Sequence, residues 1–582
     1  MAKRKIYSSM FGGKPAAASS KIQLPGVTSP KGMKLAKEAQ ALWKSGDYGQ
    51  ASTLFLKAWE AAPDDMRLLV YVTHILGELN AQVQAIALLE AAIARHGATE
   101  EICLIMAQMA IRMQLYDIAE KLFHTAITLN PQNESHYVNL TGVLKAQEKY
   151  DEAISLLQDI LPIFPQSGKL WSNLAVIAHE QDGSGTFNFH LEAMKYGSQD
   201  YEVLNNYANT ADAKPVEMEF ADVGDSEAAF RAAIKIDASR PQARVGLALI
   251  LMARGSLKEA WQQYEYRLDP VQGQETVATY THKCKRWKGS NLKGKKLLIS
   301  AEQGIGDEVL YAMQFPALIE QGAKLYISCD PRLATIYKRS FPGCEISGYK
   351  DRLTHGTRFR TFPAFETDDT GAANLVDFEI PLASLPNYGW QNFDILPDMS
   401  EGYLKACPNL KKEFQDRISA LNLTGKNIGL SWRSGKLTKG RGHSYLTLEL
   451  LQPLFELEGL NFFNLQYSCD QDEITAFEKE TGHKLHQFKD IDLKADIEAN
   501  LAIMDNMDLV IGPSTATQMF AVSLGLPTYY LTHGHPWWLF SKEAREVPWF
   551  SKKSHIFPKT TNDWDKPLED LVAATQALFA TV

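Results

Sequence analysis

A 34-residue period in the first half of the chain constrains the fold more than any other feature of the sequence. Small residues recur at this interval, at Ala51, Ala85, Ala119 and Ala153. A large apolar residue follows each of them four positions later, and the period slips within 212–225 before it resumes at Ser226 and Ala260. A small side chain lets two helices approach closely, and a bulky one fills the gap to the next pair. The pattern therefore predicts a stack of helical hairpins.

In its period and in its small and bulky positions, the segment 31–270 resembles tetratricopeptide (TPR) repeats. Such repeats form a superhelix whose concave face binds an extended peptide or protein. Asparagine amides suit a peptide backbone, so the candidate acceptor-binding residues are Asn139, Asn173 and Asn206. Each of them could equally be a solvated or capping residue. Residues 1–30 are basic and lack the apolar run of a signal peptide, and we expect them to form a flexible arm.

Strand and helix patterns alternate in the second half of the chain. Apolar runs such as 296–300 and 427–432 predict strands, and amphipathic segments between them predict helices. This alternation implies parallel sheets with helices on both faces. A chain of 582 residues is too long for one core. A helical segment near 410–421 divides this half, so we expect two Rossmann-like lobes, 271–408 and 409–582, with ligands in the cleft between them.

Three stretches of this second half carry a specific resemblance. EQGIGDEVLYAMQFP (302–316), IGLSWRSG (428–435) and DLVIGPSTATQMFAVSLGLPTYYL (508–531) look like bacterial TPR proteins with a heptosyltransferase-like glycosyltransferase domain. That family has the GT-B fold, in which a nucleotide-sugar site lies between two Rossmann-like lobes. The architecture is also similar to flagellin glycosyltransferases and O-GlcNAc transferases. The resemblance implies an α + α/β chain, a TPR superhelix followed by a GT-B transferase with an acceptor-side first lobe.

The turn at Gly304 and Gly306 carries its own negative charge, Asp307. In the resembled family the Asp of this G-x-G-D turn faces the acceptor, which implies that Asp307 is the catalytic base. An inverting transfer needs a group that takes the proton of the attacking hydroxyl. From the residues alone, Asp307 could instead satisfy the first amides of a helix, and Glu302 and Glu308 are the alternative carboxylates. The third glycine of a dinucleotide fingerprint is missing, which argues against NAD.

The second lobe offers candidate residues for the nucleotide sugar, to which we add the two turn glycines Gly304 and Gly306. Cations after the strand at 427–432 suit a diphosphate, and hydroxyl residues at a helix N-terminus suit a phosphate. Residues at the end of a strand near 466 could contact the base of the nucleotide. The candidates are Arg433, Lys436, Arg441, Gln466, Ser514, Thr515, Ala516 and Thr517. A solvated loop, an N-cap and an ordinary strand end are the alternative interpretations.

The chain departs from the heptosyltransferase pattern at two positions of this lobe. That pattern has an Asp and a His where this chain has Ser514 and Met519. The loss of the carboxylate puts ADP-heptose in doubt as the donor. It allows a more anionic or differently shaped nucleotide sugar, and it does not by itself imply inactivity.

Composition excludes several classes of protein. A net charge of −9 argues against a nucleic-acid binder. Six scattered cysteines without a C-x-x-C pair fit reduced, cytoplasmic thiols and not a zinc site. The longest apolar run, 245–253, is too short to span a membrane. We find no ligand set at metal spacing, and we expect neither a metal nor another cofactor.

The resemblance then implies an inverting, metal-independent glycosyltransferase. It would move a sugar from a nucleotide-sugar donor to Ser or Thr of a protein held by the TPR repeats, with flagellin as the acceptor suggested by architecture. Two alternatives stay open. The acceptor could be a lipopolysaccharide, or the chain could be a TPR adaptor whose transferase-like domain is not catalytic.

Overall fold

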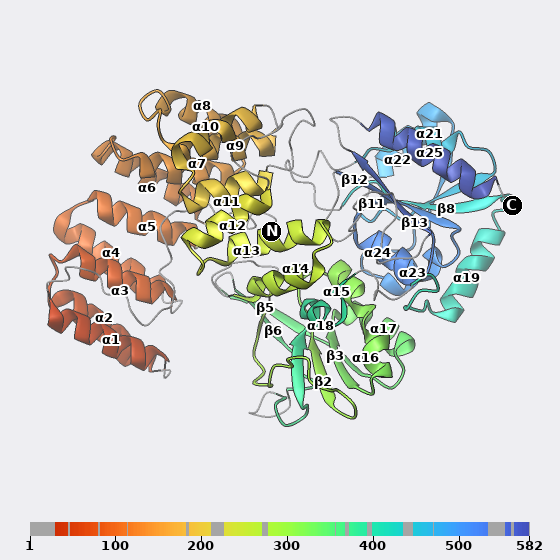
Figure 1. Ribbon diagram of the computed structural model, residues 1–582, viewed down its shortest axis with the longest axis horizontal. Helices are drawn as coiled ribbons and strands as arrows, with labels where there is room; N and C mark the ends of the chain where they lie inside the picture. Colours follow the sequence, from red (N-terminus) through yellow and green to blue (C-terminus); the bar gives the residue numbers. More distant parts are fainter. Residues whose placement is uncertain are drawn as a thin grey trace.

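The computed structural model describes residues 29–44, 47–78, 82–112, 115–181, 185–210, 226–269, 278–354, 357–366, 372–392, 399–434, 446–468, 471–533, 553–559 and 564–580. Helices fill the first half of this range, and two α/β units follow (Figure 1). The helices of the first half are α1 (Pro30–Lys44), α2 (Tyr48–Glu60), α3 (Met66–Glu78), α4 (Gln82–His96), α5 (Glu100–Arg112), α6 (Tyr116–Leu129), α7 (Glu134–Ala146), α8 (Tyr150–Ile160), α9 (Gly168–Gln181), α10 (Thr186–Gly197), α11 (Tyr201–Thr210), α12 (Ser226–Ile236), α13 (Pro241–Ala253) and α14 (Leu257–Tyr264).

These helices pack as consecutive antiparallel pairs, and the spacing of small and bulky residues explains why. Ala119 and Phe123 of α6 are both fully buried, one at the close approach of two helices and the other in the gap to the next pair. Gly246 of α13 has no room for a side chain because the ring of Phe230 in α12 fills the space. Each pair buries its apolar face against its neighbours, as a TPR superhelix requires. The predicted superhelix is confirmed.

The first lobe contains a parallel sheet in the order β4-β3-β2-β7 and a small mixed sheet in the order β1-β6-β5. Its strands are β1 (Thr279–Tyr280), β2 (Lys296–Ser300), β3 (Lys324–Cys329), β4 (Glu345–Gly348), β5 (Lys350–Thr354), β6 (Thr357–Thr361) and β7 (Phe378–Pro381). The short helix η2 (Glu265–Leu268) continues from α14 at the end of the superhelix. The helices of the first lobe are α15 (Ile305–Ala312), α16 (Phe315–Glu320), η4 (Pro331–Leu333), α17 (Ala334–Ser340), η5 (Leu382–Ser384) and α18 (Pro386–Gly389).

The second lobe contains a parallel sheet in the order β10-β9-β8-β11-β12-β13. Its strands are β8 (Lys426–Leu430), β9 (Leu460–Asn464), β10 (Leu485–His486), β11 (Leu509–Pro513), β12 (Thr528–His533) and β13 (Ser554–Lys559). Its helices are α19 (Pro408–Ser419), α21 (Gln452–Phe455), α22 (Gln471–Thr481), α23 (Ile497–Met504), α24 (Ala516–Ser523) and α25 (Asp565–Phe579). The apolar run Leu509–Pro513 is buried along its whole length, as expected for a central parallel strand.

Both lobes have the strand order of a doubly wound fold, which confirms the predicted two Rossmann-like lobes. Numbered along each lobe, the order of the parallel strands begins 3-2-1-4 in both. The order reverses between β2 and β7 in the first lobe and between β8 and β11 in the second. Ligands of such sheets bind at the carboxyl ends of the strands beside this reversal. The reversal points therefore direct attention to the loops after β2, β8 and β11.

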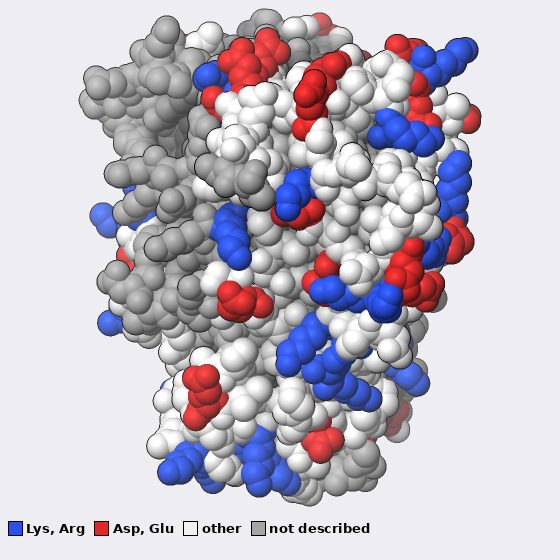
Figure 2. Space-filling model, turned by 90° about the vertical axis from the view of Figure 1, so that its right-hand side faces the viewer, with Lys and Arg blue, Asp and Glu red and all other residues white. Residues whose placement is uncertain are grey.

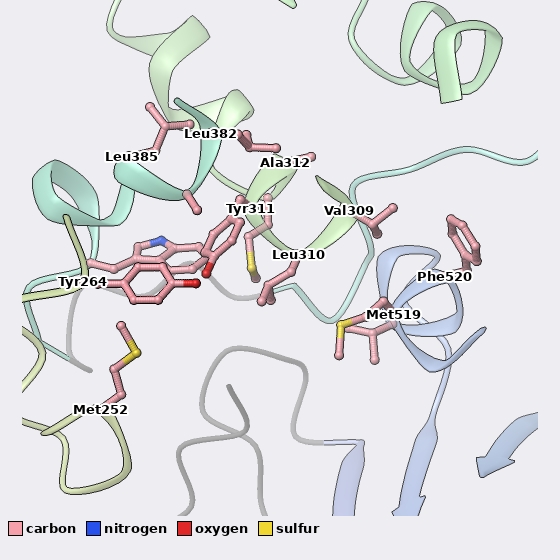
Figure 3. Packing of buried hydrophobic residues seen from close by; sticks show 14 of the residues in the cluster. Met252, Tyr264, Val309, Leu310, Tyr311, Ala312, Leu382, Leu385, Met519 and Phe520 are labelled. Atoms are coloured by element: carbon pink, nitrogen blue, oxygen red, sulfur yellow. The ribbon is translucent and has the colours of Figure 1, made fainter. Parts of the chain in front are cut away.

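The last repeats and the two lobes share one hydrophobic core. Side chains of α13 and α14, of α15 and of α24 meet in it, including Met252, Tyr264, Leu310 and Met519 (Figure 3). The superhelix therefore ends against the first lobe, and the first lobe lies against the second (Figure 1). None of the described helices is both long and apolar enough to cross a membrane.

Candidate functional site

The two sequence motifs singled out above meet where the two lobes touch. Helix α15 begins directly after the Gly304 turn of the first lobe, and α24 begins directly after the loop that follows β11. The two helices pack against each other near their N-termini. A Cβ on Gly306 would lie 3.4 Å from the Cα of Ala516 and 3.6 Å from its Cβ. Small residues on both sides thus allow two helix N-termini, both favourable to anions, to approach one another.

Asp307 lies in the first turn of α15 and is half-buried. Its Oδ2 accepts the amide hydrogen of Gly304 at 3.1 Å, so the carboxylate reaches back to the residue before the helix. This is the capping contact that the residues alone suggested. A carboxylate has room for several hydrogen bonds, so this contact is compatible with a second role as a proton acceptor.

The other two carboxylates of the turn point into the first lobe. Glu302 is buried and forms an ion pair with Arg267, whose Nη2 lies 2.6 Å from Oε1. Glu308 is also buried, and its Oε2 accepts the amide hydrogen of Asp330 at 2.8 Å. Burial raises the pKa of Glu308 to about 8, although the nearby Arg360 opposes this shift. Both carboxylates are committed to the interior of the lobe, which leaves Asp307 as the half-buried carboxylate of this turn.

A polar network lies at the carboxyl ends of β8 and β11, where the strand order of the second lobe reverses. The hydroxyl of Thr515 donates to Oε1 of Gln518 at 2.8 Å, and Nε2 of Gln518 donates to Oγ of Ser431 at 2.8 Å. Thr515 is the residue before α24, and its side chain makes no capping hydrogen bond to the helix. The side chain that would ordinarily cap the helix is therefore directed to Gln518, and the first amides of α24 keep the polarity that attracts a phosphate.

Besides Thr515, three residues predicted to bind the nucleotide sugar lie at the N-terminus of α24 or just before it. Ser514 and Ala516 are half-buried, and Thr517 is buried. Met519, which stands where the resembled family has a His, lies one turn further along α24 in the seam between the lobes. Figure 3 shows it beside Phe520, across from Val309 of α15. The position that would carry an imidazole is here part of the apolar contact between lobes.

Arg433 and Gln466 were predicted to face the nucleotide, and the structure gives both of them protein partners. The guanidinium of Arg433 forms a two-pronged ion pair with Glu473 of α22. Oε1 of Gln466 accepts the amide hydrogens of Trp432 and Arg433, at 3.0 and 2.9 Å. Gln466 therefore shapes the start of the loop after β8, and Glu473 neutralises its first cation. Lys436 and Arg441, the other predicted cations of this loop, lie outside the described residues.

The asparagines of the superhelix differ in their surroundings. Asn173 is buried and donates to the carbonyl of Val138 and the hydroxyl of Thr141, at 3.0 and 2.8 Å. Asn206 is buried and donates to Oγ of Ser172 at 3.0 Å. Both amides thus link one repeat to the next. Asn139 is half-buried.

Sequence reasoning missed the residues that support the Gly304 turn. Nε2 of Gln303 donates to the hydroxyl of Tyr264 at 2.9 Å, and Arg267 holds Glu302. Tyr264 lies four residues after Ala260, at the bulky position of the last repeat. The sequence hints at this supporting role only through the position of Tyr264 and Arg267, which both lie at the end of the repeats.

Acidic and basic side chains are interspersed on the face shown in Figure 2. Within the described ranges, no group of three His, Cys, Asp or Glu side chains is placed to hold a metal ion. Metal independence stays a prediction.

The chain is similar to known proteins in both halves. Residues 216–273 match the tetratricopeptide-repeat family. Protein FlbA of Caulobacter vibrioides is 28% identical over 566 residues, which cover 94% of this chain and 90% of that protein. A solved glycosyl transferase of family 9 from Veillonella parvula is 12% identical, with a TM-score of 0.37, and covers 50% of this chain and 99% of its own. YrrB, a TPR protein with an unusual peptide-binding site, is 15% identical with a TM-score of 0.23, over 32% of this chain and 95% of its own.

The repeats and the two doubly wound sheets together define the architecture of the chain. The chain joins a tetratricopeptide superhelix to a two-lobed α/β domain.

Proposed function

We propose that this protein is an inverting, metal-independent glycosyltransferase that moves a sugar from a nucleotide sugar to Ser or Thr of a protein held by the TPR repeats. The observation that carries the proposal is the contact between Gly306 and Ala516. It brings the turn with Asp307 to the helix end that is suited to a phosphate, and both lie at the reversal points of their sheets.

In this proposal Asp307 accepts the proton of the acceptor hydroxyl while the hydroxyl oxygen bonds to the anomeric carbon. The bond from that carbon to the nucleoside diphosphate breaks at the same time, and the diphosphate leaves with the electron pair and the negative charge. The N-terminus of α24, with Ser514, Thr515 and Thr517, stabilises this charge. The cations of the loop after β8, Lys436 and Arg441 among them, assist it.

We further propose flagellin as the acceptor and the cytoplasm as the place of reaction. Repeats of this kind hold extended protein segments, which supports a protein acceptor. The cysteines of the described part of the chain are free thiols, in keeping with a reducing compartment.

The test is an intact-mass measurement of flagellin co-expressed with and without this protein. A mass increment equal to one or more glycosyl units, present only in the co-expressed sample, is the expected result and identifies the class of sugar. Flagellin of unchanged mass contradicts flagellin as the acceptor, and the same measurement on a lipopolysaccharide core then tests the other acceptor.

A second candidate function is a TPR adaptor with a non-catalytic domain, which the pairing of Arg433 with Glu473 and the buried Met519 favour. Thermal unfolding with UDP, GDP, ADP or CMP separates the two functions. A nucleotide present at a hundred times its Kd raises the unfolding free energy by about 2.7 kcal/mol. A rise in Tm with one of these nucleotides supports the transferase, and an unchanged Tm with all four supports the adaptor.

A further inference from the structure

We propose that the last repeat belongs to the catalytic machinery, with Tyr264 as a positioning residue that holds the turn from Gly304 to Asp307 in its working conformation. The proposal rests on the proposed function for the role of Asp307. It adds that the superhelix and the turn act as one unit.

The backbone directly before the turn needs support. Gln303 has a φ of 61°, in the left-handed region that residues with a side chain disfavour. Such a conformation persists where surrounding contacts hold it, and it is common at functional sites. The contact that holds Gln303 comes from the repeats, because its Nε2 donates to the hydroxyl oxygen of Tyr264 at 2.9 Å.

Tyr264 is itself rigidly placed. It is the last residue of α14, its side chain is buried, and its ring meets that of Trp261 edge to face at 5.9 Å. Nε1 of Trp261 donates to the carbonyl of Trp390 at 2.8 Å, which ties α14 to the first lobe. Figure 3 shows Tyr264 next to Tyr311 of α15, the helix that carries Asp307.

A second contact from the same end of the superhelix holds the preceding residue. Arg267 and Glu302 are each 1% exposed, and Arg267 also donates to Oγ of Ser384 at 2.8 Å. Oε1 of Glu302 accepts the amide hydrogen of Ala383 at 2.8 Å. A buried, fully hydrogen-bonded pair of this kind fixes geometry. Both residues that lead into Gly304 are therefore held by residues at the end of the repeats.

This arrangement has a functional consequence. A protein bound along the superhelix is presented to a carboxylate whose position the superhelix itself determines. Loosening the turn would then lower the rate of transfer without changing the binding of the nucleotide sugar on the second lobe, because the side chains that hold Gln303 and Glu302, Tyr264 and Arg267, lie at the end of the superhelix.

The test compares four full-length proteins, the wild type, Tyr264→Phe, Gln303→Gly and the double variant, by hydrogen–deuterium exchange of the peptide that spans 301–308. Phenylalanine keeps the ring and removes only the hydroxyl. We expect the exchange rate of this peptide to rise about fivefold in Tyr264→Phe, as for the loss of one hydrogen bond. Glycine adopts positive φ freely and lacks the amide, so Tyr264→Phe should add nothing in the Gln303→Gly background.

The matched control is Tyr196→Phe, on an exposed tyrosine of α10, which should leave the exchange of this peptide unchanged. An unchanged exchange rate in Tyr264→Phe, or the same increase in both backgrounds, overturns the proposal. With flagellin as acceptor, Tyr264→Phe should lower kcat by about tenfold and leave the donor KM unchanged. If no variant modifies any acceptor, the proposed function fails, and the exchange comparison still decides whether Tyr264 holds the turn.

Discussion

Arg339 of the first lobe and Glu498 of the second form a two-pronged ion pair, with Nη1–Oε1 and Nη2–Oε2 distances of 3.1 and 2.6 Å. About a fifth of each side chain is exposed, 21% and 22%. A planar guanidinium that meets both oxygens of a carboxylate fixes the orientation of the two partners. The pair therefore helps to fix the lobes in the arrangement that brings Gly306 to Ala516.

Arg339→Gln should lower the free energy of unfolding by about 1.5 kcal/mol, because Glu498 is left half-buried without its cation. Urea unfolding measures this loss. In the double variant with Glu498→Gln the loss should be smaller than the sum of the two single losses, by about 1 kcal/mol. Strictly additive losses would show that the pair contributes nothing as a pair. Lys412→Gln, which removes an exposed pair with Asp416 on α19, is the control and should change stability little.

Asp307→Asn separates the two roles of this carboxylate. The Oδ1 of asparagine can still accept the Gly304 amide hydrogen, but an amide cannot take a proton from the acceptor. Transfer should fall by about 10²- to 10⁴-fold with an unchanged Tm, measured by intact-mass time courses and thermal unfolding. Asp307→Ala should in addition lose about 1 kcal/mol of stability with the capping contact. Native-rate transfer by Asp307→Asn would refute the base assignment and leave only the cap.

Glu308 predicts a pH dependence of stability. Its pKa is raised from 4.5 to about 8 in the folded protein, chiefly by burial. The folded state then binds more protons than the unfolded state between these pH values, so the contribution of Glu308 to stability is full below pH 4.5 and is lost as the pH rises to about 8.

Glu308→Gln removes this titration and should keep the hydrogen bond from Asp330. The free energy of unfolding of the wild type, relative to that of the variant, should therefore decrease as the pH is raised from 4.5 to 8, in urea titrations at several pH values. The exposed Glu345→Gln is the control and should run parallel to the wild type. A parallel curve for Glu308→Gln would show that Arg360 keeps Glu308 ionised throughout.

The superhelix was predictable because its contacts are local. A 34-residue period records which residues touch within a hairpin and between neighbouring hairpins, and Ala119 and Phe123 are buried where it places them. The parallel strands were predictable for a similar reason, since a strand buried on both faces reads as an apolar run. Because the strands are parallel, the loops after β2, β8 and β11 then lie at the carboxyl ends of their sheets.

Contacts between distant segments were not predictable in this way. Arg433 was assigned to a phosphate on its charge and its place after a strand, but Glu473 on another helix is its partner in the structure. Nothing in the spacing of Tyr264 and Gln303 indicates that they touch, because one belongs to a repeat and the other to a turn of the first lobe. Such pairs depend on how whole domains dock, which periodicity does not record.

Gly512 tests the geometry of the second lobe's site. A Cβ at this position would lie 2.6 Å from the carbonyl oxygen of Ser431, and closer still to the hydroxyl of Ser431 and the amide of Gln518. Gly512→Ala should therefore force β8 and β11 apart at their carboxyl ends, or break the Ser431–Gln518 hydrogen bond. We expect a loss of about 1–3 kcal/mol in the free energy of unfolding, and a loss of any nucleotide-induced rise in Tm.

Gly49→Ala is the matched control, because a Cβ at this position of α2 meets no atom within 4 Å. Alanine there should leave stability unchanged or raise it slightly, since alanine favours a helix more than glycine does. Urea unfolding of both variants, followed by thermal unfolding with UDP, GDP, ADP and CMP, makes the comparison. If Gly512→Ala behaves like Gly49→Ala in both measurements, the ends of β8 and β11 tolerate an extra methyl group, and the close approach of Gly512 to Ser431 is not what shapes the phosphate side of the site.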